Sequence, residues 1–289
     1  MRVPDMVLKS VGFVGEVVDE ESGEGDLHAT GFILSIPTQE PNRKLHVFVT
    51  AKHAVEALKD REVYFLTNRK GGGAIRIRDH AGCMWVHQTD KTCDCVVMPF
   101  NVAPEMDYNS IAFDSLVTPE TMQSYNIGIG DEVFFPGLFT YAPGDKENMP
   151  IVRHGNLAML PKEQIQIESG FADVYLIEAR SIGGLSGSPV FVRPTKIVTM
   201  GDGKQCAVLA DPDTFFCLGL ICGHWDIREG ELNKAFAALD RRNGVNLGIG
   251  IVVPAYKIRE IIENTPDLVK LRQGALVNDS LCSTTNRGS

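Results

Sequence analysis

Three residues whose types can work together in acyl transfer lie at separate places in the chain. Ser186 lies between glycines in the run 184–189, which reads Gly-Leu-Ser-Gly-Ser-Pro. His53 follows an apolar, strand-like segment, and Asp94 comes directly before another. A serine hydroxyl is a weak nucleophile and needs a neighbouring base, and an imidazole base needs an acceptor that fixes its tautomer. Ser186, His53 and Asp94 supply the residue types that this chemistry requires.

The glycines around Ser186 indicate a turn in which backbone amides are uncrowded. The N–H groups of Gly184 and Ser186 are the candidates for an oxyanion hole, because both could donate to the charge that develops in an acyl-transfer transition state. A cluster of Gly, Ser and Pro between apolar runs also describes an ordinary turn. This motif by itself therefore leaves both interpretations open.

The position of Asp94 next to an apolar strand predicts that its carboxylate has a partner, for which His53 is the candidate. A carboxylate at the mouth of an apolar strand is costly to bury unless a partner compensates its charge. His53, at the end of another apolar strand, is the candidate partner. Taken singly, His53 could be a core histidine and Asp94 a cap at a strand start, but their occurrence together with Ser186 favours the catalytic interpretation.

In these motifs the chain resembles the trypsin/chymotrypsin-like serine peptidases, in particular the bacterial intracellular and HtrA-like branches. The family's Thr-Ala-x-His motif occurs at 50–53, its Asp before a hydrophobic strand at 94–97, and its Gly-x-Ser-Gly-[Gly/Ser]-Pro motif at 184–189. An α/β-hydrolase would instead run in the order Ser, acid, His, and would place Gly where this chain has Ser188. The order of the motifs therefore favours the peptidase family.

This resemblance implies an all-β fold of two six-stranded antiparallel β-barrels followed by a C-terminal helix. Short apolar runs separated by turn residues agree with an all-β chain. We expect residues 1–125 to form a barrel with His53 and Asp94, and residues 126–253 a barrel with Ser186. A helix at 254–272 and a loose tail at 273–289 are expected to follow, without the peptide-binding module that HtrA-like proteins append.

Composition limits the classes of partner. The chain has 289 residues, 44% of them hydrophobic, which suits one globular domain made of two subdomains. A net charge of −9 argues against nucleic acid or an anionic membrane as the main partner. The sequence offers no apolar run long enough for a transmembrane helix and no secretory signal pattern at its start. We therefore expect a cytoplasmic protein.

Seven cysteines cannot all pair within one chain, and most lie in apolar runs, which suits a reducing compartment. Cys93 and Cys95 flank Asp94 at alternate strand positions, so they share a face. Zinc would need two more ligands, which the sequence does not offer in a suitable motif. Packing around the acid is the favoured interpretation, and neither a metal nor a cofactor is expected.

The resemblance also implies where a substrate lies. In the family the strand that includes 219–225 pairs with an extended substrate, which makes Cys222, Gly223 and His224 candidates for substrate binding. Arg180, six residues before Ser186, lies where family members often have the floor of the specificity pocket. A guanidinium there would favour an anionic side chain, whereas a different loop length would turn it outward into solvent.

Departures from the family pattern bear on regulation. Leu185 replaces the acid with which many secreted members capture a new N-terminus, so activation by that ion pair is excluded. We expect an intracellular serine endopeptidase that acts on protein or peptide substrates. It would be either constitutively active or latent until a regulatory partner or effector acts. The alternative is a catalytically silent, protease-like protein that binds peptides or serves as a scaffold.

Overall fold

The computed structural model describes residues 2–17, 25–58, 63–79, 85–87, 90–144, 146–181, 183–200, 205–209, 214–227 and 245–274. Strands make up most of the regular structure, as expected for an all-β chain. The expected tail lies outside the described residues apart from its first two positions, and so do Cys83 and Cys282.

The first half of the chain forms one eight-stranded sheet in the order β5-β4-β1-β2-β3-β7-β6, with β8 added in parallel to β2. Its strands are β1 (Val11–Val17), β2 (Gly25–Pro37), β3 (Lys44–Thr50), β4 (Val63–Asn68), β5 (Ala74–Asp79), β6 (Val86–His87), β7 (Val96–Pro99) and β8 (Ile111–Ala112). Within the described residues no ladder joins β5 to β6, so the expected first barrel is not found to be closed.

The second half contains a closed antiparallel barrel of six strands in the order β10-β13-β18-β17-β14-β9. These strands are β9 (Glu132–Gly137), β10 (Ile151–Met159), β13 (Tyr175–Glu178), β14 (Pro189–Arg193), β17 (Phe216–Ile227) and β18 (Val245–Pro254). Two hairpins accompany it: β11 (Ile165–Ile167) with β12 (Gly170–Ala172), and β15 (Thr195–Thr199) with β16 (Gln205–Leu209). The predicted division at residue 125 falls between β8 and β9.

Short helices connect and flank the strands. They are α1 (Asp5–Leu8), α2 (Lys52–Glu56), the 3-10 turn η1 (Phe113–Ser115), α3 (Pro119–Tyr125), α4 (Ala255–Asn264) and α5 (Pro266–Arg272). The helix expected at 254–272 is thus two helices, which meet at Thr265 in an extended conformation with ψ 116°. The cause is Pro266, because a proline disfavours the helical conformation of the residue before it.

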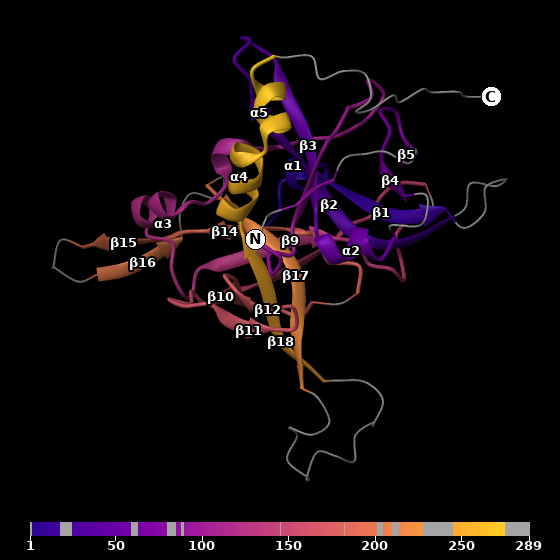
Figure 1. Cartoon of the computed structure of the whole chain (residues 1–289). Helices are drawn as coiled ribbons and strands as arrows, with labels where there is room; N and C mark the ends of the chain where they lie inside the picture. Colours follow the sequence, from indigo (N-terminus) through magenta and orange to yellow (C-terminus); the bar gives the residue numbers. More distant parts are fainter. Residues whose placement is uncertain are drawn as a thin grey trace, which may run out of the picture.

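Helix α4 joins the two halves of the molecule. Its apolar side chains at Ile258, Ile261 and Ile262 are buried in one cluster that also contains Phe48 of β3 and Phe191 of β14. The three-and-four spacing of these isoleucines, visible in the sequence, places them on one helix face. Figure 1 shows α4 beside β17 and β18, with the strands of the first half next to it. The helix therefore packs where sheet and barrel meet.

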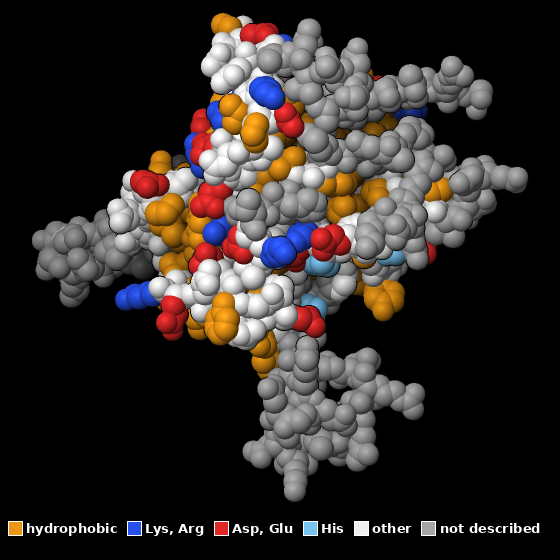
Figure 2. Space-filling view, in the orientation of Figure 1, with side chains coloured by type: hydrophobic (Ala, Val, Ile, Leu, Met, Phe, Trp, Pro, Cys, Tyr) orange, Lys and Arg blue, Asp and Glu red, His pale blue; other side chains and the backbone are white. Residues whose placement is uncertain are grey.

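The surface of the described residues carries both signs of charge. On the face in Figure 2, Lys and Arg side chains lie next to Asp and Glu side chains instead of gathering in one broad basic patch. None of the helices in the described part of the chain has the length and apolar character needed to span a membrane.

We predict that shortening Ile258 weakens the whole fold. Its side chain is fully buried at 0% exposure, whereas Ile129 is 69% exposed. The substitution Ile258→Ala should lower the free energy of unfolding in urea by about 2–5 kcal/mol, because it leaves a cavity between the halves. The matched variant Ile129→Ala should change it by less than about 0.5 kcal/mol. Equal effects of the two variants would contradict the bracing role of α4.

Candidate active site

The pairing of two strands brings His53 and Asp94 together. Strands β3 and β7 are antiparallel, with Thr50 opposite Val96, so the end of one lies beside the start of the other. Ala51 is extended and ends the strand, and His53 lies in the first turn of α2. Asp94 comes two residues before Val96. The motifs at 50–53 and 94–97 are therefore neighbours because of the sheet register.

Asp94 holds His53 through two hydrogen bonds. Its Oδ2 lies 2.5 Å from His53 Nδ1, and its Oδ1 accepts a hydrogen bond from the backbone N–H of His53 at 2.8 Å. The Asp94 side chain is only 18% exposed, so these bonds compensate a carboxylate that is largely removed from water. The imidazole is fixed with Nδ1 as donor, which leaves Nε2 as the acceptor on the opposite side of the ring.

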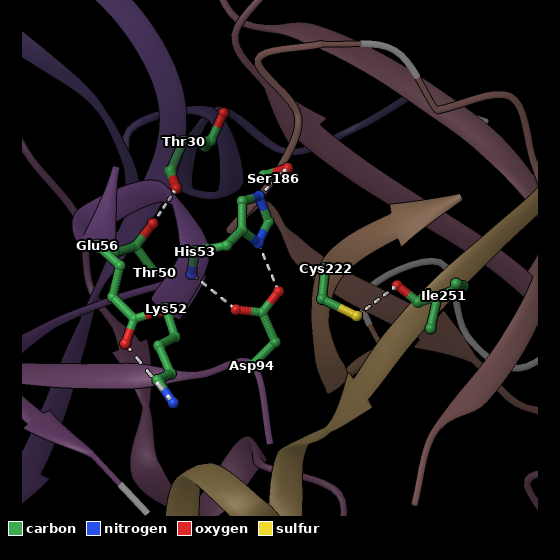
Figure 3. A network of polar contacts seen from close by, with 9 residues as sticks. All are labelled: Thr30, Thr50, Lys52, His53, Glu56, Asp94, Ser186, Cys222 and Ile251. Carbon is green, nitrogen blue, oxygen red and sulfur yellow. Dashed lines mark hydrogen bonds and ion pairs between the residues drawn. The ribbon is translucent and has the colours of Figure 1, made fainter. Parts of the chain in front are cut away.

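Ser186 lies on that opposite side. Its Oγ is 3.0 Å from His53 Nε2, within hydrogen-bond distance, as Figure 3 shows. The serine is carried by the turn between β13 and β14 of the barrel, whereas the histidine belongs to the first half of the chain. The three residues singled out in the sequence are thus in one line of contacts. The arrangement can transfer a proton from the serine to the imidazole.

Two glycines give the turn its shape. Gly184 and Gly187 have φ of +93° and +85°, which favour glycine over residues with a Cβ. The Gly187 amide donates to Ile221 O at 2.7 Å. In the described part of the chain, the amides of Gly184 and Ser186 have no acceptor. Both N–H groups proposed for an oxyanion hole therefore remain able to bind an anionic oxygen.

The cysteines near Asp94 are buried thiols. Burial raises the pKa of Cys93 to about 12 and raises that of Cys95 well above its usual value. The pKa of Cys222 is raised by burial and also by the charge of Asp94, and its Sγ donates to Ile251 O at 3.5 Å. Protonated thiols are poor metal ligands. Cys93 and Cys95 belong to the apolar core, which agrees with a packing role.

The residues predicted to bind substrate lie along and beside β17. Its first part pairs with β14. The Ile221 N–H donates to Ser188 O at 2.9 Å, and Ile221 O accepts from the Gly187 N–H at 2.7 Å. Beyond Ile221, β17 pairs with β18, and among the described residues no second ladder to β17 is found at Cys222 and Gly223. A strand edge of this kind can pair with an extended peptide.

Arg180 lies just after β13, and its side chain is exposed. An exposed guanidinium corresponds to the solvated alternative that the sequence left open, and its part in a specificity pocket stays a prediction. Sequence reasoning gave no role to Thr30 and Thr50, which are both fully buried next to the turn. Thr50 was noted only as the first residue of the Thr-Ala-x-His motif, and the signal at Thr30 was a polar residue in an apolar strand.

The chain was compared with family models, curated proteins and solved structures. No family model matches the chain, and no curated protein matches it. A solved structure, the MamO protease domain from Magnetospirillum magneticum in its apo form, is similar over 71% of this chain and 93% of that chain. The sequence identity is 16% and the TM-score is 0.43. At this level the similarity says nothing about the residues of the site.

We predict that the pKa of His53 depends on Asp94. The hydrogen bond to Asp94 raises the pKa of His53 above 6.5, burial opposes the rise, and the charge of Asp94 adds to it. In Asp94→Asn the pKa should fall, because burial is then opposed only by the charge of Glu56. Histidine NMR signals followed through a pH titration measure both values. An unchanged His53 pKa in Asp94→Asn would contradict the contact.

The raised pKa of His53 also determines how the stability of the folded protein depends on pH. Because folding raises the pKa of His53, protonation of this histidine contributes to stability at a pH below its unfolded pKa. That contribution is lost as the pH rises through the folded pKa. In Asp94→Asn it should be absent, so the difference in thermal stability between wild type and variant should shrink as the pH rises through this window.

We predict that Gly187 tolerates no side chain. A Cβ at this position would overlap the carbonyl oxygen of Thr30, and the backbone has φ +85°. Gly187→Ala should therefore lower the melting temperature by several degrees, or prevent folding. Gly183, four residues earlier, has open space where its Cβ would be. Gly183→Ala is the matched control and should melt within about a degree of wild type; similar losses in both variants would contradict the packing of this turn.

Proposed function

We propose that this protein is a serine endopeptidase. The observation that carries the proposal is the unbroken contact from Asp94 to His53 at 2.5 Å and from His53 to Ser186 at 3.0 Å. In an acyl-transfer mechanism these residues would act as orienting acid, general base and nucleophile. The free amides of Gly184 and Ser186 would serve as the oxyanion hole.

The first step forms an acyl-enzyme. Ser186 Oγ attacks the carbonyl carbon of the scissile peptide while His53 Nε2 takes the hydroxyl proton, and the carbonyl oxygen becomes an oxyanion. The two amides donate to that oxygen, and Asp94 stabilises the imidazolium. The C–N bond then breaks as His53 passes its proton to the leaving amine. Water, deprotonated by His53, hydrolyses the acyl-enzyme by the same steps.

The edge of β17 at Cys222 and Gly223 supports a peptide as the substrate. A peptide that adds to this edge is held through its backbone, largely independently of its sequence. We assign Cys222, Gly223 and His224 to this contact. Arg180 would favour an acidic side chain if the bound substrate passes over it.

We also propose a cellular location and a class of partners for this enzyme. The five cysteines that the structure describes are free thiols, which supports a reducing, cytoplasmic location. The partners are then protein or peptide substrates, together with a regulatory partner or effector if the enzyme is held latent.

We predict that a fluorophosphonate probe labels Ser186. In wild type the rate of labelling should rise as the pH rises through the raised pKa of His53, because only the neutral imidazole accepts the proton. Ser186→Ala should abolish labelling, and His53→Ala should slow it by about 10³-fold or more. Intact-protein mass spectrometry and peptide mapping measure the extent and the position.

A histidine on the barrel provides the control. His154 of β10 has a side chain that is 41% exposed, and His154→Ala should be labelled at the wild-type rate. If wild type is not labelled at any pH, the enzymatic proposal fails as stated. A catalytically silent peptide-binding protein would then be the better account of the same fold.

A further inference from the structure

Thr30 of β2 is hydrogen-bonded to both halves of the site, in addition to the contact between His53 and Ser186. It belongs to the sheet of the first half and is fully buried, at 0% exposure. Its backbone and its side chain together contact three segments: the turn that carries Ser186, the end of β3 before His53, and the start of the segment after β9.

Toward the nucleophile, Thr30 holds two carbonyl groups of the turn. Its N–H donates to Ser186 O at 2.9 Å, and its Oγ1 donates to Gly184 O at 2.7 Å. The peptide unit that carries the Ser186 N–H lies between the two units whose carbonyls are held in this way. Adjacent peptide units are planar and are connected only through the φ and ψ angles of the Cα between them. When the units on both sides are fixed, the peptide unit that carries the Ser186 N–H has little freedom to rotate.

Toward the base, Thr30 is held in turn by β3. Its carbonyl oxygen accepts a hydrogen bond from Thr50 Oγ1 at 2.6 Å, which Figure 3 shows beside His53. Its Oγ1 also accepts from the N–H of Leu138 at 2.8 Å. The hydroxyl thus has one donor and one acceptor bond, which together fix the direction of its proton.

We infer that Thr30 is a positioning residue, whose hydroxyl orients the Ser186 amide toward the oxyanion. This inference rests on the proposed function. Without the hydroxyl, the buried Gly184 carbonyl and the Leu138 amide lose their partner, and a buried polar group without a partner is costly enough to drive a local rearrangement. The backbone bond to Ser186 and the bond from Thr50 would remain, so the nucleophile would stay near its base.

The test compares Thr30→Val, which keeps the shape but loses the hydroxyl, with Thr30→Ser, which keeps the hydroxyl. Inactivation by a fluorophosphonate over a range of concentrations separates the apparent dissociation constant KI from the maximal rate kinact. In Thr30→Val we expect kinact to fall about tenfold or more, because an oxyanion donor is misdirected, while KI changes little. Thr30→Ser should retain kinact within about threefold of wild type.

Thr67 of β4 provides a matched control for a buried threonine. It is 3% exposed, and its hydroxyl has no hydrogen-bond partner among the described residues. Thr67→Val should leave kinact unchanged. The pKa of His53, read by NMR, should be the same in wild type and in Thr30→Val, because the contact with Asp94 is untouched; a purely structural collapse would shift it.

Three results would overturn the inference: a folded Thr30→Val with the wild-type kinact, a Thr30→Ser as slow as Thr30→Val, or an equal fall in Thr67→Val. Should Thr30→Val not fold, Thr30→Cys replaces it, since a thiol of similar size is a much weaker donor, and the same fall is expected. Absence of labelling in wild type overturns the proposed function and this inference with it. Normal labelling of wild type with an unaffected Thr30→Val overturns the positioning role alone.

Discussion

The close approach of the turn around Ser186 to strand β2 is the constraint on which the site depends. Ser186 belongs to the barrel, and His53 and Asp94 belong to the first half of the chain, so their contact requires the two halves to pack backbone against backbone. Gly187 makes this approach feasible, because any side chain there would overlap the Thr30 carbonyl. The hydrogen bonds of Thr30 then set the orientation of the turn, and α4 packs across both halves.

Local sequence was enough to single out His53, Asp94 and Ser186 as candidates, because each lies in a short motif next to an apolar strand. The bonds of Thr30 were not predictable in that way, since its side chain reaches Gly184 across 154 residues. The six-stranded barrel of the second half was predicted correctly. A closed first barrel is not shown by the described residues. The predicted C-terminal helix is present as α4, and a second helix, α5, begins at Pro266 within the predicted span.

The titratable groups around Asp94 have pKa values shifted upward for different reasons. Cys93 and Cys222 are neutral thiols whose raised pKa keeps them protonated near neutral pH, so they provide an apolar surrounding for the carboxylate. The hydrogen bond to Asp94 moves the pKa of His53 upward instead. Because these thiols stay neutral near pH 7, they add no charge beside the Asp94 carboxylate. The response of these groups to pH near neutrality then depends on the protonation of His53.

The position of α4 in the chain has a consequence for the order of assembly during synthesis. Ser186, His53 and Asp94 are all translated before β18 and α4, yet β18 closes the barrel and α4 covers the junction of the two halves. At about 5–20 residues per second, the ribosome needs several seconds to add the chain between Ser186 and α4. Throughout that interval the nascent chain carries every reactive group without the framework that aligns them. The contacts that join Ser186, His53 and Asp94 therefore depend on elements that the ribosome adds after all three residues.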